Sequence, residues 1–372
     1  MSKNIILLIN TLNDGGAEKA IQTLYKQLLD EGYKIELLAL EKNKFHFSDK
    51  IKIKYLINSS FKPSGIRSLI LLPILAYKLY RYVKENEIKI VQSHLFRANY
   101  VNLLSKLLFK SDHHIQIVNH SIISRYKKNG ISGMINLKLI KKLYPIADKI
   151  ISVSNIVEKD MQNLFKFNNK KKIIFNMFDI DLIKKNAKEA IESFKFKKNK
   201  KYLISIGRLI PIKRNKDLLF AISKLDTNIE LIFLGQGSEK KNIIKIAKNL
   251  GLLKRIHFLG WVENPYKYLY RSDIFISTSQ SESFCRVIVE AMICNVPVIS
   301  SNSGGPQEII KQDVNGFLFN IGDIDSLIKK INLILNKKNL TNSILLNANK
   351  NLEKFSKKKI ISDYKSIIDP VL

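Results

Sequence analysis

The feature that most constrains the fold is a repeated alternation of short apolar runs with longer amphipathic segments. The runs have the length of strands, are rich in isoleucine, leucine and valine, and lack a polar residue at every second position. That pattern is typical of parallel strands that are buried on both faces by helices. In the first half of the chain, the predicted strands are residues 4–10, 34–40, 51–57, 88–93, 114–120, 149–154 and 172–177.

A second series of predicted strands follows a basic, polar stretch without a strand. Its members are residues 202–207, 229–235, 255–261, 274–279, 296–301 and 316–321. Two such series predict an α/β protein of two doubly wound, Rossmann-like domains that face each other across a cleft. We expect the following division: an N-terminal domain at 1–178, a linker at 179–200, a C-terminal domain at 201–352, and a helix at 353–372 that packs back on the first domain.

Composition narrows the cellular setting. The chain has 372 residues and 45% hydrophobic content, which suits two folded domains. Its two cysteines, Cys285 and Cys294, are too few for a disulfide framework, so we expect a reducing compartment. The first apolar run is short enough for a buried strand rather than a signal peptide. The longest run, residues 69–77, is too short to span a bilayer and contains Pro73. We therefore expect a cytoplasmic protein.

The charge of the chain is unusual. Sixty-three Lys and Arg residues against 32 Asp and Glu give a formal net charge of +31. A charge of this size attracts polyanions, whether nucleic acid, anionic lipid or phosphorylated substrates. A nucleic-acid-binding protein is one interpretation, but the basic residues are spread over both halves and no nucleic-acid-binding motif is present.

Two candidate phosphate sites follow predicted strands, where parallel sheets bind ligands. Gly15 and Gly16 follow the first strand and allow close approach of a ligand, although an ordinary strand-to-helix turn is the more common reason for such a pair. The Gly-x-Gly-x-x-Gly pattern of dinucleotide-binding sites is missing, so NAD is not favoured. Arg208 and Lys213 follow the first strand of the second half, and two cations there are able to hold a diphosphate. In so basic a chain, a chance pair is the alternative.

A third candidate is the stretch "SESFCRVIVEAM", residues 281–292. We expect its helix to begin near Ser283, which places Glu282 at the mouth of the cleft. Glu290 then lies roughly 12 Å further along the same helix, about the distance from sugar to ribose in a nucleotide-sugar. Carboxylates suit such hydroxyl-rich groups because they accept hydrogen bonds. The alternative is that Arg286 pairs with either glutamate on a solvated face.

Together and in this order, these stretches resemble family 4 of the glycosyltransferases, retaining enzymes with the GT-B fold of two Rossmann-like domains. The resemblance runs from "NTLNDGGAEKAI" through "SIGRLIPIK" and "GWVEN" to "SESFCRVIVEAM" and "SNSGGPQEII", and it covers nearly the whole chain. It implies a glycosyltransferase that takes a nucleotide-sugar, here a UDP-sugar, as its donor.

The resemblance also implies roles for individual residues. Arg208 and Lys213 would hold the donor diphosphate, Glu290 the ribose and Glu282 the transferred sugar. The other implied donor contacts are Gly16 near the diphosphate, Val262 at the nucleobase, and the backbone of Phe284, Cys285 and Val287 at sugar and phosphate.

His120, at the end of a strand in the first half, matches a histidine that such enzymes place near the reaction centre. His94 is a similar but weaker case, and a lone histidine after a strand is more often structural. No side chain is identified as a nucleophile.

The chain departs from the family pattern in places. Cys285 and Asn295 stand where the family usually has glycine, and the thiol of Cys285 narrows the expected sugar pocket. Residues 179–181, "DID", look like a metal motif of another transferase class but follow no strand over a nucleotide site. We therefore expect no metal and no cofactor.

The acceptor has to be predicted from the first domain. No acidic residue lies between Asp112 and Asp148, whereas a basic and apolar segment there is typical of a helix in an anionic membrane interface. A core helix with a solvated basic edge is the alternative. We expect transfer of a hexose or N-acetylhexosamine to a lipid-linked glycan, of the polyprenyl-diphosphate or lipopolysaccharide type, at the inner membrane face. A UDP-sugar epimerase with the same double-Rossmann plan is the alternative enzyme. The expected membrane-facing residues are Arg125, Lys127, Lys128, Lys138, Lys141 and Lys142.

Overall fold

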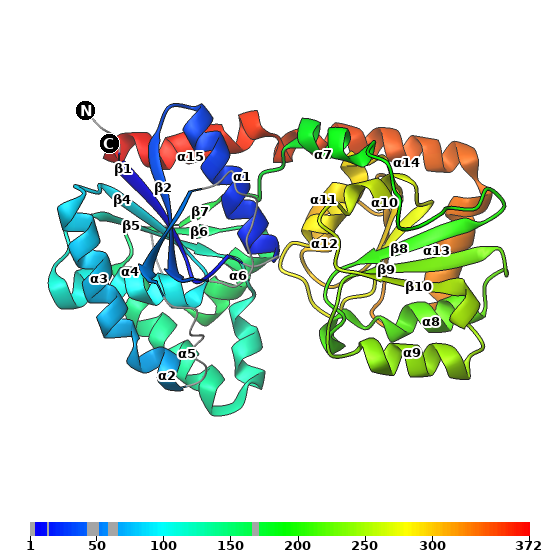
Figure 1. Ribbon diagram of the computed structural model, residues 1–372, viewed down its shortest axis with the longest axis horizontal. Coiled ribbons are helices and arrows are strands. Elements are labelled where there is room, and N and C mark those ends of the chain that lie inside the picture. Colours follow the sequence, from blue (N-terminus) through cyan, green and yellow to red (C-terminus); the bar gives the residue numbers. More distant parts are fainter. Residues whose placement is uncertain (1–3, 13–14, 43–51, 59–65, 166–170) are drawn as a thin grey trace. The chain divides into compact units, whose positions relative to one another are not determined.

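The computed structural model describes residues 4–12, 15–42, 52–58, 66–165 and 171–372 (Figure 1). The chain forms two compact units. The first comprises Met1–Phe178 together with Lys357–Leu372, and the second comprises Asp179–Ser356.

The first unit is built on a 7-stranded parallel sheet in the order β3-β2-β1-β4-β5-β6-β7. Every strand predicted for this half is present, although residue 51 of the third predicted strand lies outside the described residues. The strands are β1 (Asn4–Ile9), β2 (Lys34–Glu41), β3 (Ile53–Ile57), β4 (Ile90–His94), β5 (His114–Asn119), β6 (Lys149–Ser152) and β7 (Lys171–Ile173).

Helices cover both faces of this sheet, as the apolar runs predicted. They are α1 (Gly16–Asp30), α2 (Ile66–Ile70), α3 (Leu72–Glu85), α4 (Phe96–Phe109), α5 (Gly130–Leu143), α6 (Asn155–Leu164) and α15 (Lys357–Ile368), with 3-10 turns η1 (Ile123–Lys128), η2 (Tyr144–Ile146) and η6 (Asp369–Val371).

Strand β1 shows why its sequence is apolar without interruption. Ile5, Leu7 and Ile9 pack in one core with residues of α1 and α15. Ile6 and Leu8 point the other way, into a core with residues of α3 and α4. Because successive side chains of a strand point to opposite faces, a sheet covered on both sides needs an apolar residue at every position.

The second unit holds a 6-stranded parallel sheet in the order β10-β9-β8-β11-β12-β13. All of its predicted strands are present, as β8 (Lys201–Ile206), β9 (Ile229–Leu234), β10 (Ile256–Gly260), β11 (Ile274–Ser277), β12 (Val298–Ser301) and β13 (Phe317–Phe319). The helical elements are α7 (Ile180–Ala187), α8 (Lys216–Ser223), α9 (Lys240–Asn249), α10 (Tyr266–Tyr270), α11 (Arg286–Ile293), α12 (Pro306–Ile309), α13 (Ile324–Asn336), α14 (Lys338–Asn351), η3 (Pro211–Lys213), η4 (Leu253–Arg255) and η5 (Leu352–Phe355).

Both sheets are doubly wound, as predicted. In each, the first strand of the unit lies inside the sheet, and the chain builds outward from it first in one direction and then in the other. This reversal falls between β1 and β4 in the first unit and between β8 and β11 in the second. Ligands of open α/β sheets bind at the carboxyl ends of strands at such points. The cleft expected between the two domains stays a prediction.

The stretch predicted as a linker is partly structured. Residues 180–187 form α7, which packs against α10 and α11 of the second unit. Ile183 and Ala187, one helical turn apart, are its buried residues. The side chain of Asp179, the first residue of the "DID" stretch, caps this helix by accepting a hydrogen bond from the Leu182 N–H at 3.1 Å.

The C-terminal boundary falls a few residues later than predicted. Leu352 and Phe355 are buried in the second unit, and the Phe355 ring lies edge-on against Phe284 at 5.6 Å. Helix α15 then belongs to the first unit, where the Tyr33 hydroxyl donates to the Asp369 carboxylate. Across the described ranges, the structure contains no helix with the length and apolarity needed to cross a membrane.

We expect the first unit to depend on α15 for stability. Replacing the buried Ile360 by alanine should lower the free energy of unfolding by about 2–5 kcal/mol, because the substitution leaves a cavity in the core that α15 shares with β1. The exposed Lys358→Ala variant on the same helix is the control and should change it by less than about 0.5 kcal/mol. Chemical denaturation measures both, and equal effects would contradict the packing of α15.

Candidate active site

The carboxyl end of β8 brings Arg208 to the surface through a tight backbone arrangement. Gly207 follows the strand with a positive φ of 149°. A Cβ atom on Gly235, which follows β9, would lie 2.0 Å from the carbonyl oxygen of Gly207. The two strand ends therefore approach more closely than any side chain would allow. Arg208 emerges from this point exposed to solvent.

Lys213 is positioned by the end of the neighbouring strand β11. It closes the turn η3, after which Arg214 takes a left-handed conformation with φ 48°. The Thr278 hydroxyl donates to the carbonyl oxygen of Lys213 at 2.9 Å, and the Gln280 N–H donates to that of Ile212 at 2.7 Å. The backbone around Lys213 is thus fixed by residues more than sixty positions away in the chain.

The loop that carries Glu282 is held against the Gly304–Gly305 turn. The Glu282 N–H donates to the Ser303 carbonyl at 2.8 Å, and the Gly305 N–H donates to the Glu282 carbonyl at 2.9 Å. A Cβ atom on Gly305 would lie 2.5 Å from Cα of Phe284, so only glycine allows this approach. The "GG" of "SNSGGPQEII" therefore allows the loop that carries Glu282 to pack closely against this turn.

These two turns bring Lys213 and Glu282 into contact. The Lys213 Nζ lies 2.6 Å from the Glu282 Oε1, and the side chains are 25% and 13% exposed. Burial alone would lower the pKa of Lys213, but the charge of Glu282 outweighs it and holds that pKa above its usual value. The lysine is therefore charged at neutral pH, and the pair is a charge-assisted hydrogen bond.

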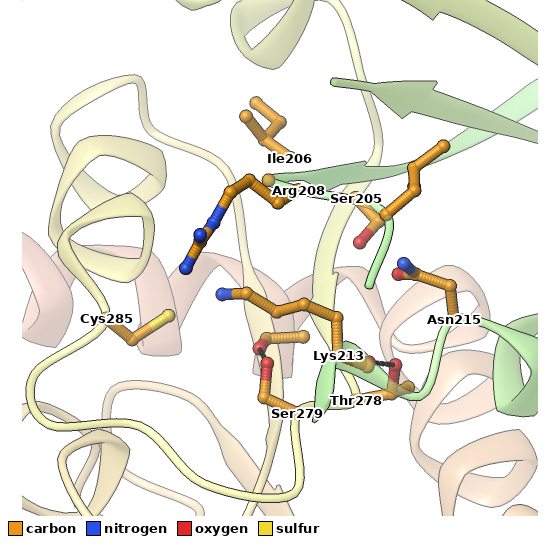
Figure 2. Close-up of a pocket in the computed structure, with 11 residues that line it drawn as sticks. Ser205, Ile206, Arg208, Lys213, Asn215, Thr278, Ser279 and Cys285 are labelled. Atoms are coloured by element: carbon orange, nitrogen blue, oxygen red, sulfur yellow. Dashed lines mark hydrogen bonds between the residues drawn. The ribbon is translucent and has the colours of Figure 1, made fainter. Parts of the chain in front are cut away.

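A pocket that Lys213 helps to line opens at the switch point of the second sheet. In Figure 2, the side chains of Arg208 and Lys213 project toward the same space, and the Cys285 thiol borders it. Its lining comes from the end of β8, the η3 turn, the residues that end and follow β11, and the start of α11, namely Ser205, Ile206, Gly207, Arg208, Leu209, Lys213, Asn215, Ser277, Thr278, Ser279 and Cys285.

Helix α11 begins later than predicted. Its first residue is Arg286 rather than Ser283, and Cys285 precedes it in a left-handed conformation with φ 69°. Only Glu290 of the two glutamates therefore lies on the helix, and the prediction that both share one helix is wrong. The physical reason is the seat on Gly304 and Gly305, which holds the glutamate loop in a non-helical path until Cys285 turns the chain.

Glu290 lies inside the protein, one turn into α11. Its side chain is 4% exposed, and the Oε1 atom lies 3.7 Å from the Nε of Arg286. Burial, reinforced by the charge of Glu290, raises the pKa of the Tyr266 hydroxyl above its usual value. Of the two partners left open for Arg286, the structure gives Glu290. The two side chains are only 9% and 4% exposed, so this pair does not lie on a solvated face as the alternative had supposed.

The remaining residues predicted to bind the donor differ in burial and in position. Phe284 is buried, and its ring faces Phe355, so its backbone is the part beside the glutamate loop. Val262, in the loop after β10, and Val287, in the first turn of α11, are half-buried. Gly16 is the first residue of α1, in the first unit.

In the first unit, His120 contacts a second histidine. The Nδ1 atom of His94, the last residue of β4, lies 2.9 Å from the Nε2 of His120, which follows β5. Burial lowers the pKa of His94 well below its ordinary value, and His120 adds to that effect. The sequence analysis named His94 and His120 as separate candidates and missed both their contact and Gln92. The available signal was Gln92 and His94 at alternate positions of one strand, with Gln116 in the next.

The predicted membrane-facing residues lie on η1 and α5. Lys127, Lys128, Lys138, Lys141 and Lys142 are exposed, whereas Arg125 is half-buried. Two large apolar side chains on α5 are also exposed, Ile131 by 79% and Met134 by 57%. Residues 131, 134, 138 and 141 follow the spacing of one helical face, so this face is apolar at its start and basic at its end.

Sequence comparison matches both units to known families. Residues 14–182 match the family described as Glycosyltransferase Family 4, and residues 186–352 match that described as Glycosyl transferases group 1.

Curated relatives cover most of the chain. It is 30% identical over 313 residues to a capsular polysaccharide biosynthesis glycosyltransferase, CapH, of Staphylococcus aureus, covering 80% of this chain and 81% of that protein. It is 27% identical over 361 residues to the N-acetylgalactosamine-N,N'-diacetylbacillosaminyl-diphospho-undecaprenol 4-alpha-N-acetylgalactosaminyltransferase of Campylobacter jejuni, covering 96% of this chain and 97% of that one.

Solved structures share the fold. HepE from Anabaena, in complex with UDP and glucose, superimposes with a TM-score of 0.81 at 22% identity, covering 99% of this chain and 100% of that chain. A sucrose-phosphate synthase from Thermosynechococcus elongatus gives a TM-score of 0.85 at 16% identity, covering 99% of both chains. The predicted GT-B architecture of two Rossmann-like domains is confirmed.

Both thiols should be unreactive in the folded protein. Burial raises the pKa of Cys285 to about 12, with Glu282 adding to the shift, and burial likewise raises that of Cys294 to about 12. At pH 8 the thiolate fraction is then about 10³-fold lower than for an ordinary thiol. Alkylation by iodoacetamide, followed by mass spectrometry, should be slow for both residues and become rapid in guanidinium chloride. Rapid labelling of native Cys285 would contradict the described pocket.

Proposed function

Because the chain belongs to the group 1 glycosyltransferases, we propose that it moves a hexose or N-acetylhexosamine from a UDP-sugar to a lipid-linked glycan with retention of configuration. The observation that carries the proposal is the Lys213–Glu282 pair beside Arg208 at the switch point of the second sheet. Two cations that line one pocket, one of them in contact with a carboxylate, suit a ligand that is anionic at one part and rich in hydroxyls at another.

In this proposal Arg208 and Lys213 bind the donor diphosphate. Charge grows on the nucleotide as the glycosidic bond breaks, and fixed cations stabilise it in the transition state. They supply the positive charge that a metal ion gives in other transferases, so the reaction is expected to proceed in the presence of a chelator. The N-terminus of α11, where the helix dipole is positive, adds to the same effect.

Glu282 is assigned to the transferred sugar. Its ion pair with Lys213 engages Oε1, and we assign Oε2 to hydroxyls of the sugar. Glu290 is assigned to the ribose hydroxyls, with Arg286 holding its carboxylate in place until they arrive. The backbone near Val262 is assigned to the nucleobase. Attack by the acceptor on the same face of the sugar then needs no nucleophilic side chain.

The acceptor class rests on relatives and on charge. The Campylobacter jejuni relative is named for an undecaprenol-diphosphate substrate, and it matches 96% of this chain. A polyprenyl-diphosphate acceptor resides in a membrane, so an enzyme that uses it has to reach the lipid surface. The exposed face of α5, apolar at Ile131 and Met134 and basic beyond them, suits an anionic membrane interface. We propose that the enzyme binds the cytoplasmic face of the membrane there.

Incubation with a panel of UDP-sugars tests the activity. UDP release that depends on added lipid extract supports transfer to a lipid-linked acceptor, and the anomeric configuration of the product tests retention. Turnover of the UDP-sugar without any acceptor would favour an epimerase of the same plan. Absence of UDP-sugar binding together with nucleic-acid binding would favour the polyanion-binding alternative.

Removing the pocket cation should abolish most activity. We expect Lys213→Met to lower kcat/KM by about 10²–10³-fold, because the diphosphate loses a charge partner in the transition state. The matched control is Lys224→Met, which removes an exposed lysine paired with Asp325 at 3.2 Å, and it should leave kcat/KM unchanged. Equal activity of the Lys213→Met variant and the wild type would contradict the assignment of the donor site.

Membrane binding should depend on α5. Replacing Lys138, Lys141 and Lys142 together by serine should weaken binding to vesicles rich in anionic lipid by about 3 kcal/mol, roughly 100-fold, at about 1 kcal/mol per lysine. The control replaces three exposed lysines of the second unit, Lys241, Lys245 and Lys248. Sedimentation with vesicles at low and high salt measures both variants. The membrane assignment fails if the two triple variants bind equally well, or if high salt does not release the wild type.

A further inference from the structure

A hydrogen-bonded series of buried polar side chains connects α15 to His120 in the first unit. Gln92 and His94 lie on one face of β4, and Gln116 lies opposite Gln92 on β5. Gln92 and His94 are each 1% exposed and Gln116 is 0% exposed, within a core that is otherwise apolar. Buried polar groups destabilise a fold unless they are hydrogen-bonded, so we expect each of these three side chains to have a hydrogen-bond partner.

The direction of donation along this hydrogen-bonded series is fixed, because the series begins at a backbone carbonyl oxygen. The oxygen of Ile367, in the last turn of α15, accepts a hydrogen bond from the Gln116 Nε2 at 3.0 Å. A carbonyl oxygen cannot donate, so this contact sets which way the Gln116 amide is turned. The Gln116 Oε1 then accepts from the Gln92 Nε2 at 2.8 Å.

The hydrogen bonds of Gln92 also determine which nitrogens of the two imidazole rings carry protons. The amide of Gln92 is turned so that its Oε1 lies 3.2 Å from the Nε2 of His94, which therefore carries a proton. A neutral His94 then has its lone pair on Nδ1. That atom lies 2.9 Å from the Nε2 of His120, which must be the donor. A charged His94 would instead donate from Nδ1 to a lone pair on the Nε2 of His120, but burial, with His120 adding to it, lowers the pKa of His94 and disfavours that form.

We propose that Gln116, Gln92 and His94 act as a relay that fixes His120 in the tautomer with its proton on Nε2 and its lone pair on Nδ1. His94 is a positioning residue, since it acts through His120, and the carbonyl of Ile367 is the anchor. The inference rests in one respect on the proposed glycosyl transfer, since the family resemblance is what places His120 near the reaction centre. With this tautomer, His120 accepts a hydrogen bond or a proton only at Nδ1.

Histidine ¹⁵N NMR on the full chain tests the tautomer without reference to activity. Two-bond ¹H–¹⁵N spectra distinguish protonated from unprotonated ring nitrogens, and the His120→Gln variant assigns the His120 signals. We expect neutral His120 to be protonated at Nε2 in the wild type. A proton on Nδ1, or an average over both nitrogens, would overturn the relay, and this measurement needs no variant of the buried residues.

Two variants of His94 separate positioning from packing. Asparagine at 94 offers an oxygen near the place of Nδ1, whereas leucine fills the space without an acceptor. We expect His94→Leu to lose the tautomer preference of His120 and to lower kcat by about 10- to 100-fold, while His94→Asn retains both in large part. Equal behaviour of the two variants in the NMR spectra would overturn the relay. A lost tautomer preference with unchanged kcat would instead overturn the placement of His120 near the reaction.

Discussion

The contact between Lys213 and Glu282 keeps one of the two cations of the second unit's pocket charged. Two largely buried charges stabilise each other only when their geometry is held, and an unpaired partner would be costly. Here the backbone holds it, through the Thr278 hydroxyl on one side and the close approach of Gly305 on the other. Lys213 follows β8 and Glu282 follows β11. These two strands are neighbours in the sheet although they are distant in the sequence, so the doubly wound topology brings the pair together.

Much of this fold was predictable because its strands are buried on both faces, which leaves continuous apolar runs that have no other simple explanation. Helix α7 was missed because it buries little more than Ile183 and Ala187 and is otherwise polar. The start of α11 was misplaced because the left-handed turn at Cys285 is imposed by packing against Gly305, and no local propensity signals it. The pairing of Lys213 with Glu282 has no signature in the sequence, since only the strand order makes them neighbours.

The two units repeat one architecture with different chemistry at equivalent places. At its switch point, the second unit presents a lysine held charged by a glutamate, together with an arginine. Near its own switch point, the first unit holds two imidazole rings in contact, one of them kept neutral by burial. Fixed charge suits an anionic donor, and a neutral ring suits the hydroxyl of an acceptor, which loses a proton during transfer. This difference supports the proposal that the second unit binds the donor.

The most direct measurement of the central claim is a crystal structure with a bound UDP-sugar. The account predicts phosphate oxygens within about 2.7–3.2 Å of the Lys213 Nζ and the Arg208 guanidinium, with sugar hydroxyls on the carboxylate of Glu282. A nucleotide bound elsewhere, with the Lys213–Glu282 pair facing no part of it, would contradict the account.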